Sequence, residues 1–247
     1  KNVPKTKWHT FDDSKNWLQM DKFGHFYTAY KINNLVTNSF EWSGLPKNSS
    51  IILGTTVSFG YQTTFEIFDA YSQEWGFSWS DMAANTIGSG GYLVQKLVWD
   101  EERIIPKFSF RPTEFAKYRP EILGKTFSEQ LLKDYNGQTY WASINVKSFF
   151  PETQLPNWFN IAIGYGARTM LGGYENAWTT ASGISINRSD IPRYKRFYLS
   201  ADIDLARIKT KNKTLKTVFS LFNVLKVPAP TVEWNGLGKL RFHPYFY

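Results

Sequence analysis

The sequence predicts an α+β protein, with an N-terminal helical domain followed by an antiparallel β-barrel or half-barrel in an outer membrane. Two patterns predict this fold class. Over the first 100 residues, apolar side chains recur every three or four positions, as they do on one face of a helix. After about residue 105 they alternate with polar side chains, as they do in strands. We therefore expect a helical domain over residues 1–104 and a β domain over residues 105–247.

Three helices are expected in the first domain. The first covers residues 16–39, where apolar and aromatic side chains repeat at helical spacing, and the turn formers of 43–46 follow it. The second covers residues 50–74, although its beginning is rich in Thr, Val and Gly. The third covers residues 81–97, with Ser80 as its expected N-cap.

The strands expected in the second domain are of two kinds. Three of them have about nine or ten residues, the length of a tilted strand that crosses a bilayer, and they cover 140–148, 158–167 and 197–206. The shorter candidates cover 107–111, 178–186, 231–234 and 237–247.

An amphipathic helix is expected over residues 214–226, within the β domain. Its apolar side chains fall on one face and lysines flank that face. A basic helix with an aromatic face lies on membrane surfaces, so Phe219, Phe222 and Lys216 are candidate membrane-interface residues. The alternative is an ordinary surface helix packed on the sheet.

Alternation by itself also fits a sheet with one face in water, but three features favour an outer-membrane barrel. Tyr and Trp lie at strand ends, and residues 241–247 form an alternating C-terminal strand that ends in an aromatic residue, with Pro244 as a departure from that pattern. The polar faces carry charges of both signs, which suits a polar lumen: Lys147, Asp202, Asp204, Lys239 and Arg241. The expected partner is therefore outer-membrane lipid.

Composition excludes several other classes. The chain has no cysteine, so it has no disulfide, thiolate metal site, cysteine nucleophile or cysteine for a lipid anchor. Nothing at Lys1 resembles a signal peptide, and no uncharged apolar segment reaches about 18 residues. The net charge of +8 comes from scattered basic residues without a nucleic-acid platform, so no nucleic-acid partner is expected.

Polar residues within the apolar helices predict a shared site. Three pairs lie one helical turn apart, which places the members of each pair on one face: Asp21 with His25, Glu66 with Asp69, and Asp81 with Asn85. Carboxylates and imidazoles are costly to bury unless they are paired or ligated. We therefore expect the three pairs to meet.

Three interpretations of that site remain open, and the first is preferred. In a structural network that includes Asp69, Lys22 neutralises Glu66 or Asp81, and His25 donates to a carboxylate and locks the helix packing. Asn85 forms hydrogen bonds between helices, and Gly88 lets two helices approach closely. In a metal site, His25, Glu66 and Asp81 bind a divalent Zn, Mn or Fe ion, and no other cofactor is expected. In a catalytic site, His25 is a general base beside Asp21 and Glu66, for hydrolysis or acyl transfer, although no nucleophile motif accompanies it.

The ordered motifs resemble a bacterial envelope family. They are Asp21-Lys22-x-x-His25-Phe26, then Glu66, then Gly76-Phe77-Ser78-Trp79-x-Asp81-Met82-Ala83-x-Asn85-x-x-Gly88. This set is similar to YfiM-like predicted outer-membrane or periplasmic lipoproteins of Gram-negative bacteria, and more loosely to VanZ-like membrane proteins. Residues 132–140 and 163–173 resemble longer members, which join a helical half to a strand-rich half. The resemblance implies an envelope location more firmly than an activity.

These observations predict a non-enzymatic outer-membrane protein. We expect an accessory or structural subunit of an envelope complex for protein assembly or secretion, bound to other envelope proteins. The alternative is an envelope hydrolase or acyltransferase on lipid or cell-wall material that uses His25.

Overall fold

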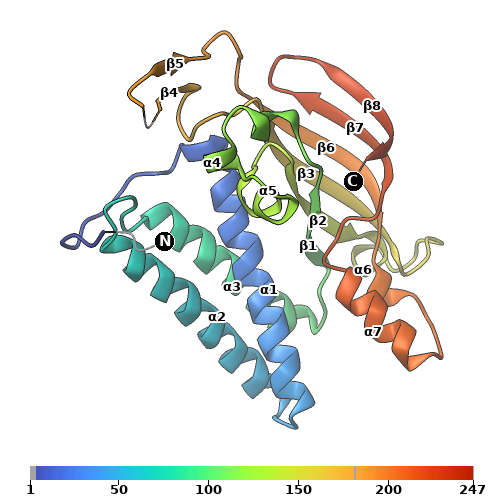
Figure 1. The fold of residues 1–247 in the computed structure, drawn as a ribbon. Coiled ribbons are helices and arrows are strands. Elements are labelled where there is room, and N and C mark those ends of the chain that lie inside the picture. Colours follow the sequence, from blue (N-terminus) through green and yellow to red (C-terminus); the bar gives the residue numbers. More distant parts are fainter. Residues whose placement is uncertain (1–3, 181, 247) are drawn as a thin grey trace. The chain divides into compact units, whose positions relative to one another are not determined.

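The computed structural model describes residues 4–180 and 182–246, which include neither Lys1 nor the terminal aromatic residue Tyr247. The chain forms two compact units, Lys1–Glu102 and Arg103–Tyr247. The first is helical and the second contains an antiparallel sheet, so the predicted α+β class is confirmed (Figure 1).

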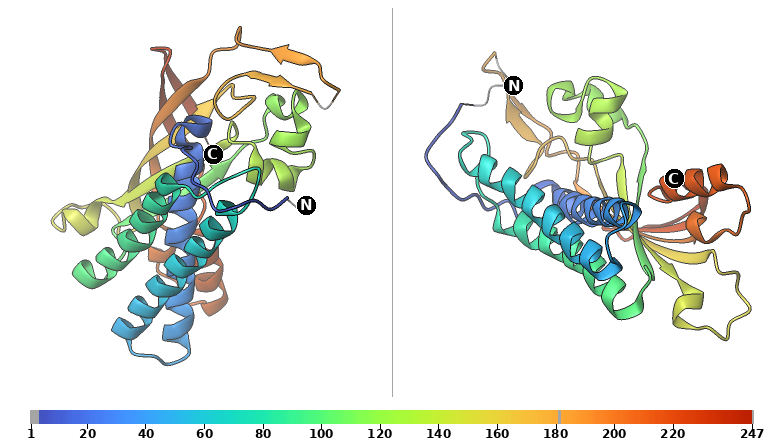
Figure 2. Two further views of the ribbon diagram at one scale, coloured as in Figure 1. Left: turned by 90° about the vertical axis from the view of Figure 1, so that its left-hand side faces the viewer. Right: turned by 90° about the horizontal axis from the view of Figure 1, so that it is seen from below.

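Three long helices build the first unit. They are α1 (Met20–Trp42), α2 (Lys47–Ala70) and α3 (Trp79–Trp99), preceded by a 3-10 turn at Asn16–Gln19, and they lie side by side (Figure 2). All three were expected, with ends that differ by a few residues. The predicted N-cap was wrong, because the Ser78 hydroxyl accepts the Asp81 N–H at 3.0 Å and Ser80 lies within the helix.

Small and polar residues fill the space between these helices. A Cβ atom on Gly88 would lie 2.3 Å from the backbone oxygen of Phe26, so only glycine permits this approach of α3 to α1. The buried polar side chains bond across the helices, as when the Ser58 hydroxyl donates to the Ala29 carbonyl at 2.7 Å and the Asn33 amide to the Ser89 carbonyl at 2.9 Å. No helix in the described part of the chain is both long and apolar enough to cross a membrane.

The second unit contains a six-stranded antiparallel sheet in the order β1-β2-β3-β6-β7-β8. Its strands are β1 (Ile104–Phe110), β2 (Gln138–Asn145), β3 (Phe159–Arg168), β6 (Tyr194–Ile203), β7 (Ala229–Asn235) and β8 (Leu240–Phe246). Within the described residues β1 and β8 do not pair, so the sheet is open and no closed barrel forms.

Four predicted elements need correction. The strand expected over 197–206 is β6, which begins at Tyr194 and ends at Ile203. The strand expected over 140–148 ends at Asn145, because the Asn145 side chain caps the short helix α6 (Val146–Phe149). The candidate 178–186 is a separate hairpin of β4 (Ala177–Thr179) and β5 (Ser185–Asn187). The helix expected over 214–226 is α7 (Lys213–Phe222).

α7 ends early because the segment after it pairs with β1. The Phe108 N–H donates to the Val224 carbonyl at 3.0 Å, and the Lys226 N–H donates to the Phe108 carbonyl at 2.9 Å. Between β1 and β2 the chain forms further short helical segments that were not predicted: Glu114–Lys117, α4 (Pro120–Leu123) and α5 (Phe127–Lys133). Another 3-10 turn, Leu205–Arg207, follows β6.

One face of the sheet, here called the inner face, is largely polar. Rings from three different strands meet there, since the Phe246 ring lies 4.7 Å from that of Tyr198 and 5.9 Å from that of Trp141. Deeper on this face, the Asp202 carboxylate receives a hydrogen bond from Ser143 at 2.6 Å and an ion pair from Lys107 at 2.9 Å. The outer face carries exposed apolar side chains: Ile161, Ile163, Phe197, Leu199, Val232 and Trp234.

Candidate functional site

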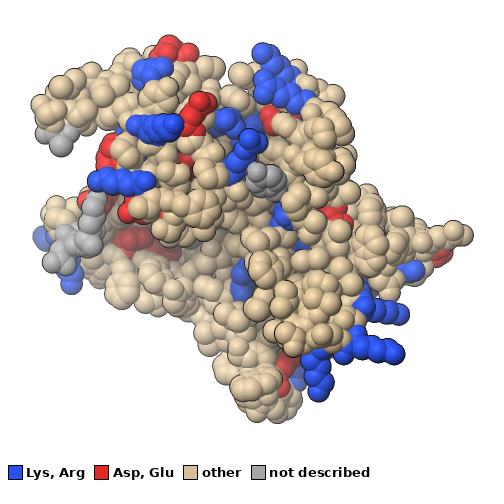
Figure 3. Space-filling model, turned by 45° about the vertical axis from the view of Figure 1, so that its right-hand side comes forward, with Lys and Arg blue, Asp and Glu red and all other residues tan. Residues whose placement is uncertain are grey.

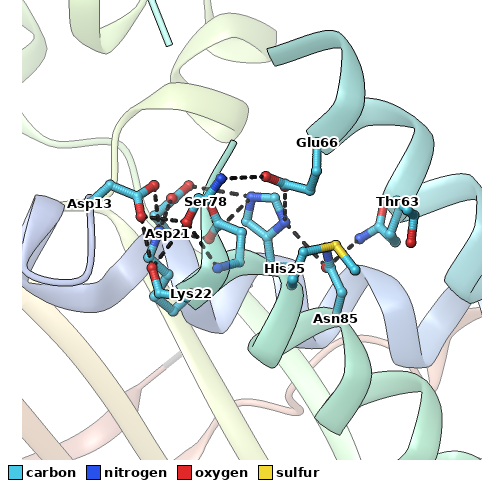
Figure 4. A network of polar contacts seen from close by, with 12 residues as sticks. Asp13, Asp21, Lys22, His25, Thr63, Glu66, Ser78 and Asn85 are labelled. Atoms are coloured by element: carbon cyan, nitrogen blue, oxygen red, sulfur yellow. Dashed lines mark hydrogen bonds and ion pairs between the residues drawn. The ribbon is translucent and has the colours of Figure 1, made fainter. Parts of the chain in front are cut away.

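A polar network joins the three helices of the first unit near the start of α1 (Figure 4). Residues from all three predicted pairs take part in it. Asp21 and His25 come from α1, Glu66 from α2, and Asp81 and Asn85 from α3.

Lys22 is the most highly connected cation of this network. Its ammonium group lies 2.6 Å from one oxygen of Asp13, 2.6 Å from one oxygen of Asp81 and 3.0 Å from Asp21. Burial alone lowers the pKa of Lys22, but the three carboxylates outweigh this effect and hold the pKa above its ordinary value. The Lys22 side chain is therefore a charged link between the segment before α1 and the first turn of α3.

Asp13 is fixed by hydroxyl groups as well as by Lys22. The Ser78 and Ser80 hydroxyls donate to one of its oxygens at 2.5 and 2.7 Å. Burial raises the pKa of Asp13, but the hydrogen bonds from Lys22 and the two serines outweigh it and lower the pKa to about 2. Asp13 thus remains ionised at neutral pH.

His25 lies between two sets of oxygen atoms. Its Nδ1 atom is 3.2 Å from the Asn85 side-chain oxygen and 3.6 Å from Glu66, and its Nε2 atom is 3.6 Å from Asp81. The side chain remains 28% exposed, whereas that of Glu66 is 2% exposed. The imidazole ring of His25 is thus a part of the network that an external molecule can reach.

The carboxylates around His25 differ from ordinary ones. Burial, and next the charge of Asp21, raise the pKa of Asp81 to about 7 against the opposing effects of His25 and Lys22. Burial also raises the pKa of Glu66. Burial raises the pKa of Asp69 as well, where the charge of His25 opposes the shift and the charge of Asp21 adds to it.

A divalent cation has one candidate set of ligands in this network. One ligand atom each from Asp21, His25 and Asp81 lies within 4.8 Å of the others. The residues offer one imidazole and two carboxylates, which suit Zn or Mn. The Lys22 ammonium already pairs with Asp81, however, and its charge opposes a second cation at that oxygen. Glu66 lies on the other ring nitrogen of His25.

A serine nucleophile is not assembled with His25. The hydroxyls of Ser78 and Ser80 donate to Asp13, and neither contacts the imidazole in the described part of the chain. Activation of a serine requires a base within hydrogen-bond reach. The arrangement therefore offers His25 a proton-transfer role toward an external molecule and no covalent step through these serines.

Two residues of the network were missed from the sequence. Ser78 has a recognisable signal, because Ser78-x-x-Asp81 has the spacing of a capping motif before a helix. Asp13 has none, since it lies in an irregular segment 68 positions before Asp81 and meets it through Lys22. Gly88 takes no part in the polar contacts and lies where α3 approaches α1.

Comparison with known proteins bears on the helical unit. Neither a curated protein nor a solved structure matches the chain. Residues 8–96, which contain the whole polar network, match the model of a family described as predicted periplasmic lipoprotein (DUF2279). The helical part of this chain is thus similar to a lipoprotein family of unknown function from the cell envelope.

Proposed function

We propose that this protein is a non-enzymatic accessory or structural subunit at the bacterial outer membrane, as a half-barrel and helices in contact with lipid. The observation that carries the proposal is the distribution of polarity. In both units, buried positions are largely polar and many exposed positions are large and apolar. Water-soluble domains place apolar residues inside, whereas proteins in lipid expose them.

The outer face of the sheet supports this proposal most directly. Ile163 and Leu199 are neighbours in the β3–β6 register and are 53% and 55% exposed. Phe197 and Trp234 stack beside them with ring centroids 5.6 Å apart. On the polar inner face, the buried Asp202 pairs with Lys107 and Ser143, as charges inside a lumen pair with one another.

α2 supports it in the helical unit. Leu53, Val57 and Ile67 are exposed on one side, while the small and polar residues face the other helices. The exposed Thr56 and Thr64 hydroxyls donate to their own helix, to backbone oxygens four residues earlier. Close helix packing through small residues, as at Gly54 and Gly88, is typical of helices in lipid.

Lipid is a better occupant of these surfaces than one protein partner. Exposed apolar residues lie on α2 and α3 in the first unit and on the outer sheet face in the second. α7 adds an exposed amphipathic helix, in which Phe222 is 56% exposed and the basic Lys213 and Lys216 are exposed too. We assign Phe219, Phe222 and Lys216 to the membrane interface. Charged side chains are separated by broad uncharged areas in Figure 3.

Flotation of the purified chain with phosphatidylcholine vesicles tests the proposal, because neutral lipid detects apolar contact alone. The chain should float with the vesicles, and Leu199→Asp should reduce binding about tenfold or more. Ser185→Asp places the same charge at an exposed position of β5 and should leave binding unchanged. A chain that stays with the aqueous fraction contradicts the proposal.

The subunit role has its own test. Purification of the chain from membranes at native expression should recover other envelope proteins with it in fixed ratio, consistent with a family from the cell envelope. Recovery of the chain alone, as a solitary monomer, contradicts a structural role in a complex.

The second candidate is an envelope hydrolase or acyltransferase, and the accessible His25 ring among carboxylates favours it. His25, Asp21 and Glu66 would then transfer protons, with a metal at Asp21, His25 and Asp81 as a variant of the same site. Elemental analysis of purified protein and of His25→Ala distinguishes a metal site from the structural network. Stoichiometric Zn, Mn or Fe that disappears in the variant supports the metal site, and its absence from both supports the structural network.

A further inference from the structure

A polar cavity at one end of the inner sheet face is a second candidate site. Its volume is about 440 Å³, which lies in the range of small-molecule sites. Four guanidinium groups line it: Arg111, Arg168, Arg196 and Arg241. Two carboxylates, Glu114 and Glu233, line it as well. The lining therefore carries an excess of positive charge.

Topology explains how these arginines meet. Arg168 is the last residue of β3, Arg196 lies near the start of β6, and Arg241 lies near the start of β8. In antiparallel neighbours, the end of one strand lies beside the start of the next. The register places Gly166 opposite Arg196 and Glu233 opposite Arg241, so one end of the sheet gathers all three arginines.

Arg196 carries the inference because it is buried and incompletely paired. Its side chain is 7% exposed, its Nε atom has no hydrogen-bond partner, and its contact with Glu233 is long, at 4.0 Å. A buried donor that is left without an acceptor destabilises the fold. An unpaired buried donor on a residue that lines a cavity indicates a ligand with acceptor oxygens.

The carboxylates do not satisfy this positive charge. Glu233 accepts a hydrogen bond from His243 at 2.9 Å, which occupies the oxygen nearest Arg196. Arg168 stacks on the Phe115 ring and makes no ion pair in the described part of the chain. Guanidinium groups match phosphate oxygens in geometry and charge, so several around one cavity favour a phosphate ester.

We propose that this cavity binds the phosphate group of a small polar molecule, of which a sugar phosphate is the model. Arg196 would contact the phosphate from the buried side, and Arg168 and Arg241 from the flanks. The Glu233–His243 pair would face hydroxyl groups of the ligand. The same chemistry comes from a free sugar phosphate or from a phosphate headgroup of a lipid, and the test separates these sources.

Calorimetric titration of the full chain with glucose 6-phosphate, and with glucose as its uncharged counterpart, is the first measurement. Glucose 6-phosphate should bind and glucose should not. Arg168→Ser and Arg241→Ser should each weaken binding about tenfold or more, because each removes charge-assisted hydrogen bonds. Arg188→Ser removes an arginine that pairs with Asp190 outside the cavity, and should leave binding unchanged.

Vesicles separate the two sources. If the ligand is a headgroup, phosphatidylcholine vesicles that contain phosphatidic acid should bind the chain more tightly than pure phosphatidylcholine vesicles, and Arg241→Ser should remove the difference. Arg196→Lys keeps the charge but loses the Nε donor, and should weaken either form of binding without unfolding the chain. Absence of both phosphate-dependent effects, or equal loss in Arg188→Ser, overturns the proposal. Binding to pure phosphatidylcholine tests only the lipid-contact function.

Discussion

Lys22 holds the polar network of the helical unit together, because three carboxylates share its ammonium group. Its side chain is 12% exposed, and those of Asp13 and Asp81 are 10% and 6% exposed. Removing one partner of a buried pair leaves uncompensated charge, which costs about 3–5 kcal/mol. The stability of the unit should therefore depend on this one residue.

Lys22→Met should lower the free energy of unfolding by about 3 kcal/mol, measured by urea titration with circular dichroism. Lys47→Met is the matched control in the same unit, because Lys47 pairs with Asp100 in the open, with side chains 46% and 74% exposed. Exposed pairs contribute about 0–1 kcal/mol, so the control should lose less than that. Equal losses in the two variants would refute a central role for Lys22.

Asp81 should make the stability of the chain depend on pH. Its pKa in the folded chain is about 7, above the ordinary 3.8, because of burial and the charge of Asp21. A raised folded-state pKa means that the folded chain retains a proton that the unfolded chain releases. This contribution to stability is complete below pH 3.8 and is lost as the pH rises to about 7 and above.

Asp81→Asn should flatten the decline of thermal stability between pH 5 and pH 8, because an amide does not titrate. The neighbouring groups Asp13, Asp21, Lys22, His25 and Glu66 remain in this variant, so the difference between the two profiles measures the titration of Asp81 and its interaction with them. Glu74→Gln, at an exposed position after α2, should keep the profile of the original chain. An unchanged slope in Asp81→Asn would disprove the raised pKa.

At the scale of elements, the packing of α3 on α1 depends on a single glycine. Gly88→Ala would bring Cβ to 2.3 Å from the Phe26 oxygen, whereas a Cβ on Gly90 meets nothing within 4 Å. We expect Gly88→Ala to destabilise the chain by about 1–3 kcal/mol, and Gly90→Ala to stabilise it by about 0.5–1 kcal/mol, since alanine favours a helix. Urea unfolding of the two variants measures both signs, and a neutral Gly88→Ala would show that the helices move apart freely.

Sequence periodicity located most of these elements but could not predict which side of each one is buried. In α2 it shows that Leu53 and Ile67 lie on the side away from Ser58 and Gln62, but it does not decide which side faces the other helices. The structure places the small and polar side inside, because Gly54 allows close approach and Ser58 bonds to α1. Apolar periodicity alone favours the opposite orientation, since it assumes water outside.

The polar site was only partly predictable for a related reason. Helical spacing joins Asp21 to His25 and Asp81 to Asn85, because each pair lies within one helix. Contacts between elements, such as Asp13 with Lys22 or His25 with Glu66, depend on tertiary packing. The arginine cavity was missed altogether, because its members come from distant strands and carry no common motif.

At the scale of the whole molecule, both units place polar groups inside and apolar groups outside. This distribution places two tryptophans of the sheet in different environments, one exposed and one buried. Trp234 is 54% exposed on the outer face, whereas Trp141 is 2% exposed on the inner face, where its indole N–H donates to the Ser109 hydroxyl. If lipid covers the outer face, acyl chains reach Trp234 and do not reach Trp141.

Fluorescence quenching by vesicles of brominated phosphatidylcholine should therefore depend on which tryptophan is present. Trp234→Phe should reduce the quenchable part of the emission, because it removes a ring that contacts acyl chains. Trp141→Phe should instead reduce the part that resists quenching, and both variants keep an aromatic ring in place. Equal effects of the two substitutions, or quenching that does not change in Trp234→Phe, would mean that the outer face of the sheet does not lie in lipid, whatever else binds the chain to the vesicle.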